Sequence, residues 1–471
     1  MKSLYKNTLL VSAFLVAIAG SVFAQTPLTS YFIESSYMRN QLNPALRPNS
    51  GYVGIPALSG VSIDYKTNTF NLDNFTFEKK INGQNERVTF MHPAVGAKEF
   101  MSNISEDNYL SYGTSLDLLS FGWYKGSTFW NVNISLKENI DFNVPKSFFR
   151  LMKEGYSQDE QTNYDLEGIS STGNLLTEIG LSYSRPILND ALTIGVRAKI
   201  LGGIANWDLH AEQLSIDAGP DYWRAKSQVK LAISAPGIKP KYNSSGILDG
   251  FGTGDWGQGL SGYGFGLDLG AVGDLGKLFP LPVLKNVRAS IALTDIGFIS
   301  WSKDNTIQLK SKATDISIPS EDRVISDEAS LEDVFEDVID DINEAVNLQE
   351  DRKGGRSTSL RSTLNVGVEY LMLDNKLSAG LLYSNRFGNY YNTQELTVSG
   401  NFRPTKWLAA SLSYSFLHSQ FDTFGGALYL TPSKFLNIFV AGDYVIPNVS
   451  PQYYPSTTKA LNLQFGISIP I

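Results

Sequence analysis

Apolar and polar residues alternate along much of this chain, most regularly at its end. Six residues between positions 461 and 471 are apolar at every second place, and those between them are small, polar or proline. Successive side chains of a strand point to opposite faces, so the pattern predicts a strand with one apolar face. Similar segments lie at residues 111–124, 127–143, 174–187, 192–200, 263–270, 286–301, 359–372, 376–386, 392–403, 406–418, 421–431, 435–446 and 460–471.

The start of the chain suggests where these strands lie. Residues 1–24 read as a signal peptide, with Lys2 and Lys6 before an apolar run over 9–19 and Ala24 at the cleavage site. No later run of eighteen apolar residues follows, whereas segments of about ten residues suit membrane strands. Only helices and closed sheets satisfy every backbone group in lipid. The sequence therefore predicts an all-β, transmembrane antiparallel β-barrel in the outer membrane of a Gram-negative cell.

Connection lengths orient the predicted barrel. Short turns at 374–375, 403–406 and 431–434 alternate with longer connections, and outer-membrane barrels keep their short turns in the periplasm. This parity places the C-terminus in the periplasm and the 302–358 insertion outside the cell, with the weak strand 305–313 inside that external loop. If residues 207–234 form two wall strands, the barrel has sixteen strands. If they form an external hairpin, it has fourteen, and we favour fourteen.

Two helices are predicted in the external loops. One spans 330–348, within an acidic loop over 314–356, and presents an apolar stripe. The other follows Pro145, over 144–152, and ends at Gly155. The simpler interpretation is that each helix packs over the barrel mouth. The alternative is a lid that gates the barrel or binds a partner.

Composition agrees with a barrel. Aromatic residues make up 12% of the chain and charged residues 18%, against roughly 25% charged in ordinary domains. The formal net charge of −8 argues against a nucleic-acid partner. There is no cysteine, and therefore no disulfide or thiolate metal site. Several aromatic residues near strand ends suit interfacial girdles, namely Trp123, Tyr124, Trp130, Trp301 and Trp407.

Residues 25–58 do not read as a wall strand, because prolines at 44 and 48 interrupt any ladder. A fourteen-stranded barrel is wider than side chains alone can fill. We therefore expect residues 25–58 to fold inward as a hatch, or plug, and residues 59–471 to form the barrel.

The motif Asn43-Pro44-Ala45 shortly after the signal peptide resembles the long-chain fatty-acid transporter superfamily and its relatives associated with gliding and type IX secretion. Segments 293–301 and 145–155 are similar to those of an uncharacterised branch, a domain-of-unknown-function family. The resemblance implies a hatch-plugged barrel that passively moves a small hydrophobic ligand and releases it sideways through the wall. The alternative is a structural or adaptor barrel for secretion or attachment of surface proteins.

Following the alternation into the predicted lumen gives a set of inward-facing charges: Glu178, Arg197, Lys199, Asp268, Arg288 and Glu369. They could line a polar conduit, but a narrow lumen requires buried charges to pair with one another or with the hatch. Arg39 and Arg47 in the hatch are the natural partners for Glu178, Asp268 or Glu369.

Catalysis and metal binding receive little support from the sequence. The three histidines have no metal-ligand spacing and no adjacent nucleophile. Asp208 and His210 form the best polar pair on one strand face, which needs no catalytic explanation. We expect no enzyme activity, no metal and no cofactor. Expected partners are outer-membrane lipid and lipopolysaccharide, a small hydrophobic ligand, and a surface or periplasmic protein.

Overall fold

The structure is a computed structural model. It describes residues 26–155, 162–219, 222–242, 244, 248–251, 259–311, 316–319, 346, 348–352, 354–388, 392–417, 421–444 and 459–471. The predicted signal peptide (1–24) and almost all of the predicted helix at 330–348 lie outside the described residues.

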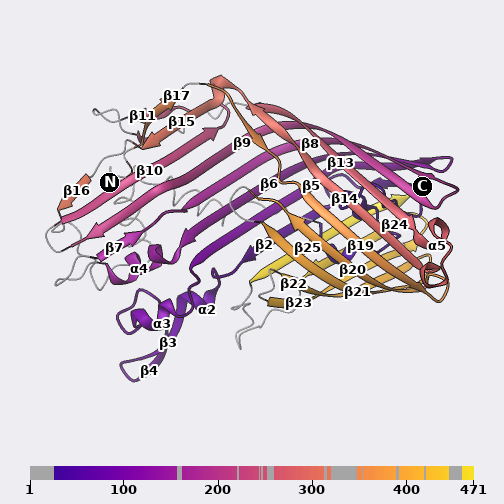
Figure 1. The fold of residues 1–471 in the computed structure, drawn as a ribbon, viewed down its shortest axis with the longest axis horizontal. Helices are drawn as coiled ribbons and strands as arrows, with labels where there is room; N and C mark the ends of the chain where they lie inside the picture. Colours follow the sequence, from indigo (N-terminus) through magenta and orange to yellow (C-terminus); the bar gives the residue numbers. More distant parts are fainter. Residues whose placement is uncertain are drawn as a thin grey trace.

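The chain forms a closed, fourteen-stranded antiparallel β-barrel (Figure 1). The first wall strand is interrupted and consists of β1 (Tyr52–Gly54) and β2 (Val61–Thr67), both of which pair with the last strand, β25 (Ala460–Pro470). The predicted count of fourteen strands is confirmed. The wall begins at Tyr52, however, earlier than the predicted boundary at residue 59.

Between these two, each wall strand pairs with the next. They are β5 (Asp107–Lys125), β6 (Thr128–Pro145), β8 (Ser170–Ile187), β9 (Leu192–Ala218), β13 (Gly262–Asp274), β14 (Val287–Trp301), β19 (Thr363–Met372), β20 (Leu377–Arg386), β21 (Thr393–Thr405), β22 (Leu408–Leu417), β23 (Phe421–Ser433) and β24 (Leu436–Asp443).

The two faces of the wall differ as the alternation requires. Large apolar side chains such as Ile200, Phe265 and Leu412 are exposed on the outside, whereas short polar side chains such as Asn401 and Ser413 are buried inside. An apolar outer surface around a polar interior is the arrangement of a membrane β-barrel. Among the described residues, no helix is long and apolar enough to cross a membrane.

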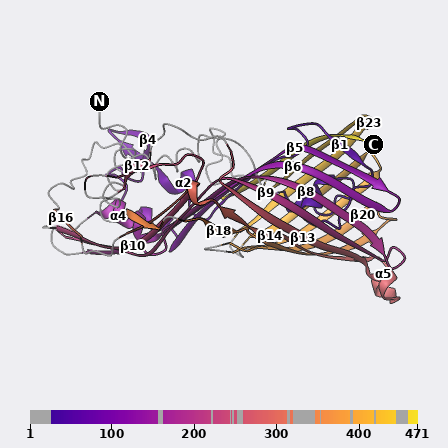
Figure 2. The same ribbon diagram turned by 90° about the horizontal axis from the view of Figure 1, so that it is seen from above.

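Beyond one rim the wall continues into a folded extension, formed by described parts of residues 68–106, 146–169, 206–251 and 303–352 (Figures 1 and 2). There β9 pairs with β10 (Tyr222–Ser234), and β10 pairs with β15 (Thr306–Ser311) and β16 (Ile316–Pro319). β17 (Leu348–Arg352) pairs with β15, and β7 (Thr162–Asp165) with β9. The described parts of residues 207–234 therefore pair as a hairpin, and the described part of 305–313 is not a wall strand, as predicted.

The extension has its own apolar core. α4 (Lys146–Glu154) corresponds to the predicted short helix and ends at Gly155, whose φ of 60° suits glycine. Its residues Phe149, Leu151 and Met152 are buried among side chains of α3 (Ala97–Met101), β9 and β10. The packing interpretation of this helix therefore agrees with the structure.

One part of the extension was not predicted. α2 (Leu72–Phe75) leads into a hairpin of β3 (Thr76–Ile81) and β4 (Gln84–Thr89). The turn is Asn82-Gly83, and both residues have positive φ. Asn-Gly is a strong hairpin signal, so this element was readable from the sequence.

The opposite rim carries mostly short turns and the C-terminus (Figure 1). The turn between β19 and β20 uses Leu373, Asp374 and Asn375, all with positive φ. A longer connection there holds α5 (Leu275–Leu278) and a 3-10 turn, η3 (Pro282–Leu284). Short-turn and long-loop ends are thus separated, as the connection lengths predicted.

Two predicted girdle residues lie elsewhere. Trp301 is buried against Leu176 and Leu201, and its indole N–H donates to Thr358 at 2.8 Å. Tyr124 donates its hydroxyl to the Pro48 carbonyl. A β-bulge in β14 reverses the alternation before Trp301, so its side chain is buried in the interior although it lies near the end of the strand.

Candidate functional site

An N-terminal segment (residues 26–51) lies within the barrel. Its 3-10 turns, η1 (Leu28–Ser30) and η2 (Tyr37–Gln41), are mostly buried. At η1, the backbone N–H groups of Leu28 and Thr29 donate to the Asp443 carboxylate of β24 at 2.7 and 3.1 Å. The first N–H groups of a helical turn have no internal acceptor, which explains why a buried carboxylate lies there.

The motif Asn43-Pro44-Ala45 forms a tight turn against the wall. The Asn43 side chain accepts from the Ala45 N–H at 2.9 Å and donates to the Tyr31 hydroxyl at 3.1 Å. A Cβ atom built on Gly195 would overlap the Pro44 backbone, and one on Gly270 would overlap Asn43. The structure therefore places the motif in a cradle of two wall glycines, where it holds the segment by shape as well as by hydrogen bonds.

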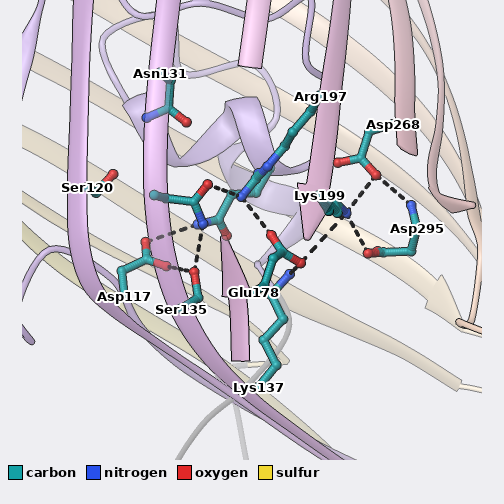
Figure 3. Close-up of polar contacts among 12 residues, drawn as sticks. Asp117, Ser120, Asn131, Ser135, Lys137, Glu178, Arg197, Lys199, Asp268 and Asp295 are labelled. Carbon is teal, nitrogen blue, oxygen red and sulfur yellow. Dashed lines mark hydrogen bonds and ion pairs between the residues drawn. The ribbon is translucent and has the colours of Figure 1, made fainter. Parts of the chain in front are cut away.

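Four of the six predicted lumenal charges form one buried network (Figure 3). Glu178 lies 2.9 Å from Arg197 and 3.9 Å from Lys199. Lys199 lies 2.6 Å from Asp268. All four side chains are 2% exposed or less. Charges removed from water this completely must be paired, and here each has a partner of opposite sign.

The other two predicted charges, Arg288 and Glu369, belong to a second network. Arg288 lies 3.4 Å from Glu369 and 2.5 Å from Glu34 of the N-terminal segment. Arg403 lies 2.9 Å from Glu369 and also donates to the Phe32 carbonyl at 2.9 Å. This network therefore joins the N-terminal segment to β14, β19 and β21.

Glu34 is held in its charged form. Burial would raise the pKa of its carboxyl, but the guanidinium groups of Arg288, Arg39 and Arg403 outweigh that effect and lower the pKa to about 2. At neutral pH Glu34 is therefore charged, and its ion pair with Arg288 attaches the N-terminal segment to the wall.

Neither arginine expected to pair with Glu178, Asp268 or Glu369 forms such an ion pair among the described residues. Arg47 donates to the Ser127 carbonyl in a turn at 2.5 Å and lies over the Tyr124 ring, outside both networks. Arg39 is buried but forms no ion pair among the residues that the structure describes. Glu34, an acid, makes the cross-contact instead of either arginine.

Sequence reasoning also missed members of the first network. Lys137 lies 2.7 Å from Glu178, and Asp295 lies 2.6 Å from Lys199. Asp117 accepts from Ser135 at 2.8 Å and from Gln41 of the N-terminal segment at 3.1 Å. Lys137 follows the alternation of β6 and could have been found. Asp295 sits in the bulge with a φ of 58°, which alternation does not predict.

The first network borders a cavity of about 150 Å³ inside the lumen. Thr26, Gln41 and Leu42 of the N-terminal segment form one side of it. Two contacts reach β6 from distant segments, namely Arg361 to Asp141 at 2.5 Å and Arg386 to Asn139 at 2.7 Å, and all four residues line the cavity. The cavity therefore lies between the N-terminal segment and these cross-lumen contacts.

Strand pairing in the wall is interrupted beside this cavity. β14 pairs with β19 through residues 287–294 and with β18 (Arg356–Ser359) through residues 298–301. Between these ladders, the Leu360 N–H donates to Gly297 at 2.9 Å and the Ser362 hydroxyl to Asp295 at 3.1 Å. Leu360, Asp295 and Thr294 also line the cavity, so the weakened part of the wall adjoins it.

Within the described ranges, no three His, Cys, Asp or Glu side chains converge as a metal site would require. The charged groups of the lumen are instead arranged in ion pairs and hydrogen bonds. This arrangement can hold the N-terminal segment.

Comparisons with known proteins give one family match and distant structural similarities. No protein with a curated description matches it. A deletion mutant of the TodX monoaromatic hydrocarbon channel aligns over 96% of each chain, with 9% identity and a TM-score of 0.40. A Pseudomonas aeruginosa FadL homologue aligns over 95% of this chain and 99% of that chain, with 10% identity and a TM-score of 0.39. The family model described as "Family of unknown function (DUF5723)" matches residues 44–443, and the chain belongs to that family.

Proposed function

We propose that this protein is an outer-membrane transport barrel that passively conducts a small ligand, with the N-terminal segment acting as a hatch. The observation that carries the proposal is the lumenal cavity, which has the N-terminal segment on one side and the interrupted wall on another. A barrel that served only as a scaffold would need neither a cavity nor a separable plug.

The attachment of the hatch is compatible with movement. It is bound to the wall by hydrogen bonds and ion pairs, including Asp443 with Leu28 and Arg288 with Glu34, and by close packing against Gly195. Each such contact contributes only a modest net free energy. A local rearrangement can therefore break some contacts while the closed wall stays intact.

The interrupted pairing between β14 and β18–β19 supports a sideways exit for the ligand. Leu360 and Asp295 belong both to the cavity lining and to the interruption. The family resemblance implies lateral release, and here an interruption of the ladder meets the cavity. The sequence predicts a small hydrophobic ligand. Leu176, Leu201 and Leu360 lie together on one side of the cavity and could contact such a ligand. Most of the remaining lining is polar, so the proposal covers a small ligand and not specifically an apolar one.

Permeability of proteoliposomes tests this function. Deletion of residues 26–50 removes the hatch and leaves β1 in place. We expect the deletion to raise the flux of small solutes and of toluene at least about tenfold. Deletion of the hairpin 76–89 is the control, because it removes an element of the extension outside the lumen and should leave flux unchanged. Equal flux for the hatch deletion and the full chain, for every solute, would show that the proposal is wrong.

An adaptor function is the second candidate, and the extension favours it. A barrel that only conducts a ligand has no need of a folded extension with its own apolar core beyond the rim. Here the partner would be a surface or secreted protein, as in the gliding and type IX relatives that the sequence resembles. Co-purification of a partner that is lost on deleting residues 314–356, together with unchanged flux on deleting the hatch, would favour this function over transport.

A further inference from the structure

We propose that the lumenal cavity is a binding site for a small zwitterionic solute of amino-acid size. The inference rests on the proposed transport function and names the class of its ligand. The site is formed by Lys137, Glu178, Asp295, Arg361 and Asn365, which come from four different segments of the chain and line the same space.

Charges of both signs face the cavity in equal numbers. The cations are Lys137, Arg361 and Arg386, and the anions are Asp141, Glu178 and Asp295. They are paired across strands, with Lys137 to Glu178 at 2.7 Å and Arg361 to Asp141 at 2.5 Å. A ligand with a single charge would leave one sign of this lining without a new partner. A zwitterion offers a carboxylate to the cations and an ammonium to the anions, and keeps the site neutral.

A buried side-chain oxygen without a hydrogen-bond donor also favours a polar ligand. Asn365 is 1% exposed and lines the cavity. Its amide nitrogen donates to the Leu42 carbonyl at 2.9 Å, but its side-chain oxygen accepts no hydrogen bond within the described part of the chain. A buried acceptor without a donor is unfavourable, and this one belongs to a residue of the cavity wall.

A hydrocarbon fits this lining poorly. Only four of the lining residues are apolar, namely Leu42, Leu176, Leu201 and Leu360. An apolar molecule would displace water from the charged groups without replacing its hydrogen bonds. The volume is suitable for either class, because a cavity of about 150 Å³ holds a molecule the size of benzene. Chemistry, not size, therefore selects the ligand.

Thermal unfolding and calorimetry of the purified full chain in detergent test the inference. The probes are L-threonine, its methyl ester, its N-acetyl derivative and toluene. We expect L-threonine to raise the melting temperature and to bind at least tenfold more tightly than either singly charged derivative. Toluene should have no effect. Binding of toluene as tight as that of threonine, or no threonine binding, would overturn the inference.

Variants locate the binding. Lys137→Met removes a cation whose side chain is 25% exposed, so the barrel should fold, and threonine affinity should fall at least tenfold. Lys230→Met, in the extension, is the control and should bind normally. Equal affinity in both variants would place the ligand elsewhere. If threonine does not bind but hatch deletion still raises flux, only the ligand class fails. If threonine binds and flux is unchanged, the transport function fails instead.

Discussion

Asp295 donates its backbone N–H to the Asp268 carboxylate at 2.7 Å, and the side chains of both residues then share one cation. Lys199 lies 2.6 Å from an oxygen of each carboxylate. The bulge in β14 makes this possible, because it brings the Asp295 carboxylate to the same ammonium group. Lys199 is therefore the central cation of the first lumenal network.

Replacing this cation should be costly. In Lys199→Met, the buried carboxylates of Asp268 and Asp295 lose their shared partner, and we expect the free energy of unfolding to fall by about 3 to 5 kcal/mol. Chemical unfolding in detergent, followed by tryptophan fluorescence, measures the change. Lys230→Met is the control, since its exposed ion pair should contribute less than about 1 kcal/mol. Equal stability of the two variants would contradict the role of Lys199.

The glycine cradle should be specific for the hatch. In Gly195→Ala, the new methyl group overlaps the Pro44 backbone, so the N-terminal segment should shift at a cost of about 1 to 3 kcal/mol. Limited proteolysis should cut the segment faster, and proteoliposome flux should rise. Gly400→Ala is the matched control in the wall, because its Cβ would have nothing within 4 Å. A similar change in proteolysis and flux in both variants would show that the glycine cradle does not hold the N-terminal segment.

Attachment of the N-terminal segment should weaken in acid. The pKa of Glu34 is about 2 in the folded protein and 4.5 ordinarily, so its contribution is fully present above pH 4.5 and is lost as the pH falls toward 2. The largest contribution that this shift allows is roughly 3 kcal/mol. Proteolysis of the segment by an acid-active protease, measured between pH 5 and 2, should accelerate over this range.

The Glu34→Gln variant isolates the contribution of this carboxyl. Its segment should be cleaved faster at pH 6, and the rise in cleavage between pH 4.5 and 2 should be smaller than in the unmodified chain. An identical pH profile in the variant would assign the acid response to other groups.

The extension should unfold separately from the barrel. Phe149 is 1% exposed in its core, so Phe149→Ala should destabilise the extension by about 3 to 5 kcal/mol. Proteolysis within residues 68–106 should increase, while the thermal transition of the barrel stays unchanged. Leu72→Ala, at a side chain that is 51% exposed, should have little effect on either measurement. Loss of the barrel transition in Phe149→Ala would show that the two parts are one cooperative unit.

Much of the wall was predictable from the sequence. The alternation of residues 461–471, the lengths of the turns and the closure of β25 on β1 and β2 all follow from a period of two residues and a lipid-facing side. The inward direction of Glu178, Arg197 and Lys199 follows from the same period. These features are local, because the residues of each strand show them without reference to other parts of the chain.

Contacts across the lumen were decided only by the tertiary structure. Glu34 meets Arg288, and Arg361 meets Asp141, between residues that are far apart in the chain. The bulge at Asp295 turns the Trp301 side chain into the interior, and the alternation of apolar and polar residues does not reveal that bulge. Which charges pair depends on the curvature of the closed wall and on the path of the N-terminal segment within it. Local sequence therefore determined the barrel, whereas closure of the barrel determined its interior.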